Sequence, residues 1–129
     1  MDYLLDFLQG DEKENPIEIK ELCFTILANL CQNCKKNKKL FREKHGIDIV
    51  ITYLKDKNIA TSNRYILLGL SLLNCLWNSI LGSRRSEERF LNSQGLFDLL
   101  EFIEVCEYSH RKLSLSCLSY LTENSKTIS

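Results

Sequence analysis

The chain has 129 residues, of which 44% are hydrophobic and 26% are charged, and its formal net charge is zero. A balanced charge excludes a global electrostatic attraction to nucleic acid or to an anionic membrane, and this apolar content excludes an intrinsically disordered chain. One proline and five glycines leave long leucine-rich segments uninterrupted, which predicts an all-α domain or part of a larger helical array.

The chain opens on two predicted helices. The first is short and covers residues 2–9, and the second runs from residue 16 to about residue 34. A capping signal marks the start of the second helix: Asn15 can cap it, Pro16 suits the first helical position, and Glu18 can reach back. The apolar residues of this helix recur at spacings of three and four, at Ile19, Leu22, Cys23, Ile26, Leu27, Leu30 and Cys31.

The middle of the chain leads to its most apolar stretch. Residues 37–45 predict a short exposed helix, and Gly46 ends it. Gly46 also opens an amphipathic unit over residues 46–58, with Ile47, Val50, Ile51 and Leu54 on one face. A polar link over residues 56–62 connects this helix to a long central helix over residues 63–82.

The central helix holds the only tryptophan, Trp77, and its apolar residues crowd more than one helical face. A helix that is apolar on most of its circumference must be covered from several sides. A transmembrane span is the alternative, since about 20 mostly apolar residues cross a bilayer. Asn74 and Asn78 interrupt the run, so a buried central helix is the favoured interpretation, and no membrane contact is expected.

The same order of elements recurs in the C-terminal third. A short helix is expected over residues 86–94, Gly95 follows it, an amphipathic helix covers residues 96–106, and a last helix covers residues 109–123. Gly95 lies 49 residues after Gly46. The apolar positions after the two glycines correspond: Ile47, Val50, Ile51, Tyr53 and Leu54 match Leu96, Leu99, Leu100, Phe102 and Ile103.

A pair of asparagines gives the same period. Asn29 precedes Gly46 by 17 residues, Asn78 precedes Gly95 by 17 residues, and the two asparagines are again 49 residues apart. The third copy is shorter, so we assign the extra residues of the second copy to residues 56–65, as a longer link or an extra helical turn. No long helix of this kind can bury itself alone, and stacked neighbours are expected to cover it.

A short helix, a glycine, a medium helix, a link and a long helix with Leu-x-Asn near its end together resemble the armadillo repeat. The resemblance implies an all-α, armadillo/HEAT-like right-handed solenoid of about two and a half helical repeats. The single domain, residues 1–129, would consist of a partial repeat (1–45), a repeat (46–94) and a partial repeat (95–129). A HEAT-type repeat and a compact helical bundle are the alternatives. At this size, exposed repeat edges and self-association through them are expected.

Two stretches resemble the cilia- and flagella-associated group of armadillo proteins: LCFTILANLCQNCKKNKKLFREKHGIDIVITYLK and LSLLNCLWNSILGSRRSEERFLNSQGLFDLLEF. The resemblance implies a non-catalytic protein-interaction scaffold, cytoplasmic and in the cilium or flagellum, that forms part of the axoneme needed for motility or sperm flagellum assembly. Its partners would be axonemal or cytoskeletal proteins, and the chain would be a segment or short isoform of a longer protein. The alternatives are a repeat that binds nucleic acid or another anionic surface, and a cargo adaptor.

In peptide-binding armadillo proteins, an asparagine near the end of the long helix lines a concave groove and holds the backbone of an extended ligand. The resemblance assigns this role to Asn29 and Asn78, with Asn74 and Trp77 as further groove candidates. Local hydrogen bonding to neighbouring helix carbonyls is an equally good interpretation of such side chains. Nuclear-import adaptors carry tryptophans one turn before this asparagine, and this chain has none there, so recognition of a basic import signal is not expected.

Two basic clusters fall at matching places in the repeat. The first holds Lys35, Lys36, Lys38, Lys39, Arg42 and Lys44, and the second holds Arg84, Arg85 and Arg89. Together they could form a ridge that contacts acidic tubulin tails, an acidic partner segment or RNA. A solvated helix edge is the alternative. Phe41 is the one aromatic residue within these clusters, and so little aromatic interleaving argues against base stacking and makes nucleic acid a poor partner.

The cysteines indicate structure rather than chemistry. Four of the six, Cys23, Cys31, Cys75 and Cys117, lie inside apolar helical patterns, where a free thiol acts as a small hydrophobe in a reducing, intracellular setting. Cys31 and Cys34 form a single CxxC pair, which is two ligands short of a structural zinc site. We therefore expect no metal and no cofactor. No nucleophile elbow, phosphate loop or catalytic carboxylate pair is recognisable, so an enzyme is not expected.

Overall fold

The structure of the chain, a computed structural model, describes residues 1–10 and 16–105, together with residues 115 and 119. Within these residues the regular structure is helical and contains no strand, which confirms the predicted all-α class. The elements are α1 (Asp2–Gln9), α2 (Ile17–Cys31), α3 (Lys35–Glu43), α4 (Gly46–Leu54), α5 (Lys57–Thr61), the 3-10 helix η1 (Asn63–Tyr65), α6 (Ile66–Ile80), α7 (Arg84–Asn92) and α8 (Gly95–Val105).

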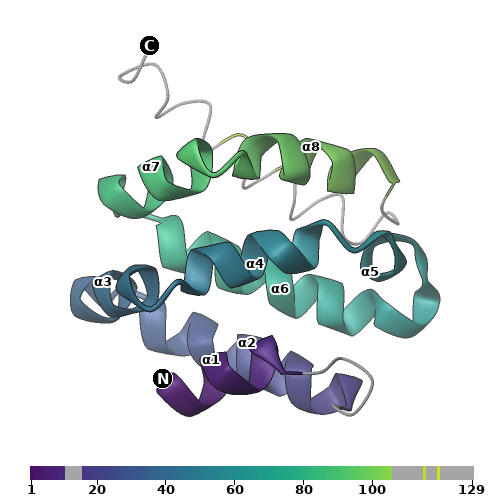
Figure 1. The fold of residues 1–129 in the computed structure, drawn as a ribbon, viewed down its shortest axis with the longest axis horizontal. Helices are drawn as coiled ribbons and strands as arrows, with labels where there is room; N and C mark the ends of the chain where they lie inside the picture. Colours follow the sequence, from purple (N-terminus) through teal and green to yellow (C-terminus); the bar gives the residue numbers. More distant parts are fainter. Residues whose placement is uncertain (11–15, 106–114, 116–118, 120–129) are drawn as a thin grey trace.

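Figure 1 shows these helices in two layers. Helices α1, α4 and α8 lie beside one another in the nearer layer, and α2 and α6 lie side by side behind them. The short helices α3 and α7 lie near each other at one end of the molecule, and α5 lies at the other end. Each layer therefore repeats one kind of helix, which is the arrangement that stacked helical repeats produce.

The helix boundaries recur with a period of 49 residues. The corresponding starts are Ile17 and Ile66 for α2 and α6, Lys35 and Arg84 for α3 and α7, and Gly46 and Gly95 for α4 and α8. The turns recur as well, since positive φ angles occur at Asn33 and Gly82, and again at His45 and Gln94. A left-handed residue ends a helix and redirects the chain, so each copy turns at the same two places.

A phenylalanine packs against the glycine that opens the medium helix in both copies. The side chains of Phe41 and Phe90 are fully buried. A Cβ atom added to Gly46 would lie 2.4 Å from Cε1 of Phe41, and one added to Gly95 would lie 2.5 Å from Cδ1 of Phe90. Glycine alone leaves room for each ring in an interior packed at crystal density, so these two glycines are packing requirements.

The long helices supply much of the core. Helices α2 and α6 pack along each other, and Phe24, Leu27 and Leu72 are fully buried there. Burying one such side chain stabilises a fold by about 1.5–3 kcal/mol. The nearer layer joins this core through Tyr53 in α4, whose ring meets that of Phe24 edge-on at a centroid distance of 5.0 Å. The Tyr53 hydroxyl also donates a 2.7 Å hydrogen bond to the Leu8 carbonyl, which holds α1 in place.

The boundaries near the N-terminus differ from the sequence-based expectation. Helix α2 ends at Cys31, three residues early, because Asn33 has a left-handed φ of 54° and the chain reverses there. Helix α3 then begins at Lys35, two residues earlier than expected. Pro16 is the N-cap residue of α2 rather than its first helical residue, and Asn15, the expected cap, lies outside the described residues.

The expected polar link is helical, in agreement with the extra turn assigned to residues 56–65. The Asp56 carboxylate accepts a 3.0 Å hydrogen bond from the Asn58 backbone N–H and caps α5, whose Ile59 and Ala60 are buried. The central helix is consequently shorter than expected, because η1 precedes α6. No helix in the described ranges combines the length and apolar character needed to cross a membrane.

Helices α7 and α8 can also be compared with the expected boundaries. Helix α7 begins at Arg84, two residues earlier than expected, because the Ser83 hydroxyl accepts a hydrogen bond from the Ser86 backbone N–H and caps the helix there. Helix α8 agrees with the expected amphipathic helix after Gly95. The last expected helix, over residues 109–123, lies outside the described residues except for two positions.

We expect Gly46→Ala to destabilise the protein, because the added Cβ atom would enter the space of the buried Phe41 ring. Overpacking of this kind costs about 1–3 kcal/mol, which lowers the midpoint of urea denaturation. In a Phe41→Leu background the same substitution should cost less, with a coupling energy of about 1 kcal/mol in the double-mutant cycle. Strictly additive effects would contradict the contact.

Candidate partner-binding surfaces

The exposed sides of α2 and α6 form one surface, which we call the long-helix face. Its residues are Leu22, Thr25 and Asn29 from α2 and Leu67, Asn74 and Asn78 from α6. All of them are exposed except Asn78, which is half-buried. A hydrogen bond of 3.4 Å from the Thr25 hydroxyl to the Ser71 hydroxyl oxygen joins the two helices beside this face. Because both helices are fixed by the core, the face has a defined shape.

The two asparagines predicted to line a groove have unequal surroundings. The Asn78 amide donates to the Asn74 backbone carbonyl at 2.9 Å and to the Asn74 side-chain oxygen at 3.0 Å. Asn29 is exposed and forms no side-chain hydrogen bond with another described residue. In α2 the position of Asn74 holds Thr25, whose hydroxyl donates to the Glu21 carbonyl at 2.9 Å. Local bonds thus occupy the NH₂ group of Asn78 and leave the Asn29 amide available.

Trp77, another groove candidate, does not join the long-helix face. Its side chain is half-buried and packs against the main hydrophobic cluster. Consecutive residues of an α-helix lie about 100° apart around the axis, which separates Trp77 from Asn78 despite their adjacency in sequence. The structure therefore brings Asn74 and Asn78 together and places Trp77 with the core.

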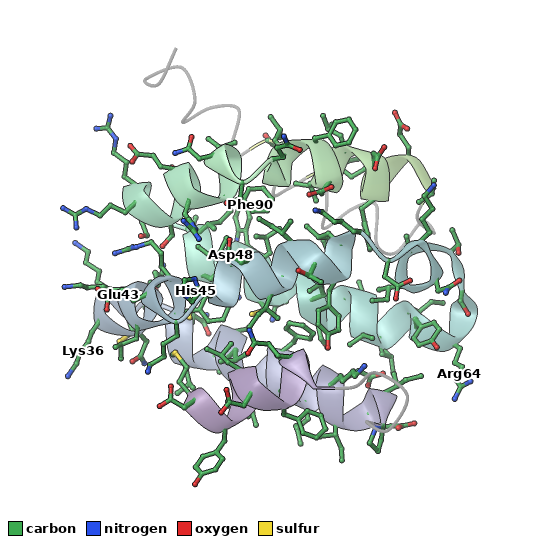
Figure 2. The ribbon with its side chains drawn as sticks, in the orientation of Figure 1. Lys36, Glu43, His45, Asp48, Arg64 and Phe90 are labelled. Atoms are coloured by element: carbon green, nitrogen blue, oxygen red, sulfur yellow. The ribbon has the colours of Figure 1, made fainter. Side chains whose placement is uncertain are left out.

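Six of the predicted cations are exposed. Arg89 pairs with Asp48, and we call the other five the basic ridge: Lys35, Lys36, Lys39, Arg84 and Arg85. The first two residues of α3 and the first two of α7 are all cations, so the clusters coincide in successive copies. Figure 2 shows Lys36 projecting away from the molecule at the end where α3 lies. Cations in a first turn oppose the helix dipole at a cost of about 0.3–1 kcal/mol, so the ridge does not stabilise these helices.

The ridge is partly balanced by its own helices. Lys39 pairs with Glu43 at 3.9 Å, and Arg84 pairs with Glu88 at 3.4 Å. Exposed pairs of this kind are worth about 0.2–1 kcal/mol and exchange readily with solvent. They leave the ridge able to contact an external anion.

The other four predicted cations form hydrogen bonds or ion pairs with residues 41 to 44 positions away in the sequence. The pairs are Lys38 with the Leu81 carbonyl, Arg42 with the Ser86 hydroxyl (3.1 Å), Lys44 with Asp2 (2.6 Å) and Arg89 with Asp48 (2.8 Å). Lys38 is buried and contributes nothing to an exposed ridge. Lys38 and Arg42 thus join the first copy to the second, whereas the pairs of Lys44 and Arg89 join helices within one copy.

Two of the buried cysteines, Cys31 and Cys75, are not activated thiols. Burial raises the pKa of the Cys31 thiol to about 11 and raises that of Cys75 well above its ordinary value. Both thiols therefore stay protonated near neutral pH and are poor nucleophiles and metal ligands. Among the residues that the structure describes, no group of three or more His, Cys, Asp or Glu side chains could hold a metal ion.

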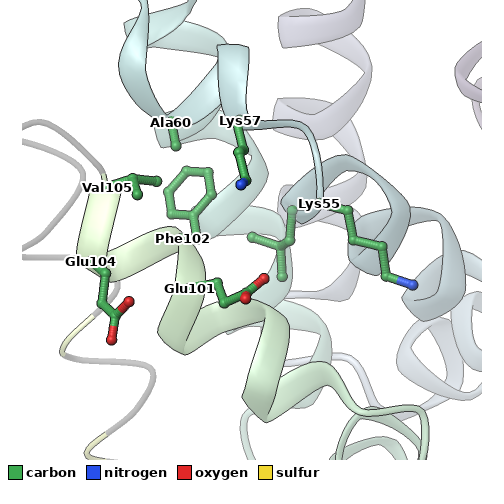
Figure 3. Close-up of a pocket in the computed structure, with 8 residues that line it drawn as sticks. Lys55, Lys57, Ala60, Glu101, Phe102, Glu104 and Val105 are labelled. Atoms are coloured by element: carbon green, nitrogen blue, oxygen red, sulfur yellow. The ribbon is translucent and has the colours of Figure 1, made fainter.

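A small pocket of about 130 Å³ lies between α5 and the end of α8. Figure 3 shows the Phe102 ring facing Ala60 in this pocket, while Lys55 and Glu104 point away from it. Small-molecule sites usually measure about 300–1,000 Å³ and contain polar groups that converge on the ligand. This pocket is smaller and its charged groups diverge, so it does not indicate a small-molecule site.

Asp98 is a buried carboxylate that the sequence reasoning missed. It lies in the first turn of α8 and is 6% exposed, and its Oδ2 accepts no hydrogen bond within the described part of the chain. Burial raises the pKa of Asp98, the nearby Lys55 lowers it, and Glu101 raises it. The equivalent position in α4 holds the buried Ile49. Aligning the two copies of the repeat places Asp98 opposite Ile49, and this mismatch could have revealed the buried carboxylate from the sequence.

Comparison with known proteins identifies the family. The family model described as cilia- and flagella-associated protein 69, ARM repeat, matches residues 2–129. Cilia- and flagella-associated protein 69 of Mus musculus is 34% identical over 120 residues, which cover 90% of this chain and 13% of that protein. The proteins of the same name from Papio anubis and Homo sapiens are 33% and 32% identical to it, respectively, over 121 residues. In both cases the match covers 91% of this chain and 13% of the relative. No solved structure matches significantly.

The chain belongs to the armadillo-repeat family of cilia- and flagella-associated protein 69, because the family model spans nearly all of it. Membership confirms the resemblance to the cilia- and flagella-associated group and decides for armadillo repeats against the HEAT-type and bundle alternatives. Repeats of this family are generally non-catalytic and generally mediate protein interactions. The chain spans 13% of the length of the curated relatives that it matches.

We expect Asp98→Ile to stabilise the protein at neutral pH, because it removes a buried carboxylate oxygen that has no hydrogen-bond donor among the described residues. The folded pKa of Asp98 is raised, so its charged form destabilises the fold above that pKa and has no effect below the unfolded pKa of about 3.9. The gain in unfolding free energy should therefore be larger at about pH 7 than at about pH 3. Urea denaturation at both pH values, with the exposed Glu104→Gln as control, checks this. An equal gain at both would contradict it.

Proposed function

We propose that this chain is a non-catalytic protein-interaction scaffold and a structural component of the axoneme, needed for motility or for assembly of the sperm flagellum. The family supports this role, since its curated members are named for cilia and flagella. The partners are then axonemal or cytoskeletal proteins, and the site of action is the cilium or flagellum. The proposal concerns what this stretch contributes to such an assembly.

In this proposal, residues 1–45, 46–94 and 95–129 are successive units of one right-handed solenoid. The 49-residue offset between the starts of α2 and α6, and between those of α4 and α8, supports both internal boundaries. The Phe–Gly contacts at the start of α4 and α8 support the same division. A solenoid presents each surface residue again in the next unit, which suits an extended partner.

The long-helix face is the proposed binding surface. The Asn29 amide can donate to a partner carbonyl and accept from a partner N–H, which suits the backbone of an extended segment. In α6, the Asn74–Asn78 pair still offers the Asn78 side-chain oxygen as an acceptor. Leu22 and Leu67 flank these amides and can contact apolar side chains of the partner. Polar groups set the register, and apolar contacts add affinity.

One observation carries the proposal: α2 and α6 hold exposed asparagine-bearing stripes in a fixed relation, because their opposite sides form the fully buried core. Ordering such residues costs little when binding occurs, since the helices are already immobilised. In the described part of the chain, no cluster of His, Cys, Asp or Glu side chains competes with this face as a metal centre.

Retention on detergent-extracted axonemes tests the scaffold. We expect the tagged chain, expressed in multiciliated cells, to remain with axonemes after the membrane is removed. A variant with Asn29→Arg and Asn74→Arg should be retained about tenfold less or worse, which corresponds to about 1.4 kcal/mol of binding free energy. Two bulky cations would occupy the face where the partner lies.

The matched control for this test is Glu104→Arg, which changes an exposed residue of α8 outside the long-helix face. It should be retained like the wild type, and circular dichroism should show equal helix content in all three proteins. A wild-type chain that washes out would contradict the axonemal scaffold. Equal retention of the double variant would contradict the long-helix face as its binding surface.

Binding of an anionic partner through the basic ridge is a second candidate function. Four of its five exposed cations lie at equivalent positions of two copies, Lys35 with Arg84 and Lys36 with Arg85, in first turns where they cost stability. An acidic protein segment that runs along α3 and α7 would meet cations at intervals set by the repeat. Such binding depends on charge and is screened at high ionic strength.

We expect a glutamate-rich peptide to bind the chain at low salt and to dissociate as salt rises, because the ridge is solvent-exposed. Reversing Lys35 and Arg84 to Glu should weaken binding about tenfold or more, which corresponds to about 1.4 kcal/mol. The control Lys55→Glu reverses an exposed cation elsewhere and should have a smaller effect. Fluorescence anisotropy that shows no binding, or binding independent of salt, would remove this candidate.

A further inference from the structure

One side of α2 carries an exposed apolar stripe, which we call the α2 edge. Its residues and exposed fractions are Ile19 (43%), Leu22 (56%), Ile26 (37%) and Leu30 (36%). They follow the spacing of three and four that places residues on one side of a helix. The stripe confirms the expectation that a repeat edge is exposed, and four large apolar residues in line on one helix indicate an interaction site.

The equivalent residues of α6 show what such an edge does. The positions 49 residues after Ile19, Ile26 and Leu30 hold Leu68, Cys75 and Ser79, and all three are buried. These residues lie on the helix that α2 covers. The α2 edge is therefore the same packing position one period earlier, with no described element of this chain on it.

We propose that a second copy of this chain covers the α2 edge, so that two α2 helices pack antiparallel about a two-fold axis. The stripe is apolar along its whole length, so it can pack against the same stripe of a second copy that runs in the opposite direction. In an antiparallel pair Ile19 faces Leu30 of the other copy, and Leu22 faces Ile26, so large side chains meet along the whole contact. An isologous dimer needs only one such self-complementary patch.

Charge at the two ends of α2 favours the antiparallel direction. The first turn of α2 carries the exposed Glu18, and the chain just beyond its last turn carries the exposed Lys35 and Lys36. An antiparallel pair brings the acidic end of each copy toward the basic end of the other. A parallel pair would place like charges together. Opposite charges at the rim of an interface select the orientation and the partner.

The proposal does not depend on the asparagines of the long-helix face or on the axonemal role, and Leu22 is the residue that both surfaces share. In the antiparallel pair Thr25 and Asn29 stay at the side of the contact, because they lie on the arc of α2 that Asn74 and Asn78 occupy on the exposed side of α6. A dimer would carry two such faces. Failure of the dimer would therefore leave the proposed function unaffected, and the reverse also holds.

Sedimentation equilibrium of the purified chain over a wide concentration range tests the proposal. The expected mass at high concentration is twice the 15.0 kDa of one chain. Ile26→Glu should raise the dimer dissociation constant about 100-fold or more, because each dimer contains the position twice and the charge would be desolvated. Leu22→Lys, on the same stripe, should act in the same direction. Circular dichroism and thermal unfolding confirm that the variants are folded.

The control is Leu67→Glu, which places the same charge on an apolar residue of α6 that is 63% exposed and lies outside the α2 edge. This variant should dimerise like the wild type. A second test addresses direction: Glu18→Lys should weaken the dimer, and adding Lys35→Glu and Lys36→Glu should restore it.

Four results would overturn the proposal. The first is a wild-type chain that stays monomeric at every concentration, which leaves another protein as the occupant of the edge. The second is a dimer that Ile26→Glu does not affect, and the third is one that Leu67→Glu dissociates. An assembly larger than two chains is the fourth, because the two-fold contact closes at a dimer.

Discussion

Helix α6 is buried on most of its circumference, and no single neighbour can supply that cover. Helix α2 covers one side along its length, α4 packs on another, and α7 closes the end. The long helix of one copy is thus the core of the next, and the fold depends on this contact more than on any local feature. The Phe41–Gly46 and Phe90–Gly95 contacts set how closely each medium helix approaches its short neighbour. Each 49-residue period in the sequence corresponds to one stacked copy in the structure.

The long-helix face, the basic ridge and the α2 edge all result from this stacking of 49-residue copies. Stacking buries Leu68, Cys75 and Ser79 on α6 and leaves the equivalent side of α2 apolar and exposed. The remaining sides of the long helices point outward together and form the long-helix face. Because the interval also repeats the starts of α3 and α7, their cations align as well. One packing relation therefore yields the long-helix face, the basic ridge and the α2 edge.

The sequence predicted the features that repeat and missed those that join the copies. Gly46, Gly95, Asn29 and Asn78 are visible as a period, so fold class and helix order followed from them. Lys38 looked like one more surface lysine, because its acceptor at Leu81 lies 43 residues away. Local chemistry explains other differences, such as the left-handed Asn33 that shortens α2. For the candidate site, the repeat spacing and the resemblance singled out the asparagines, and the basic runs singled out the cations. Only the structure showed that the Asn78 amide is hydrogen-bonded to Asn74 while the Asn29 amide is available.

Native-state hydrogen exchange tests the central claim, that α2 and α6 stabilise each other as one unit across the repeat boundary. The slowest amides of both helices should exchange with the same free energy of opening, equal to that of global unfolding and with the same denaturant dependence. Helices that belonged to separate units would instead open at different free energies. If α2 exchanged through an opening well below the global value while α6 stayed protected, stacking would not be the basis of this fold.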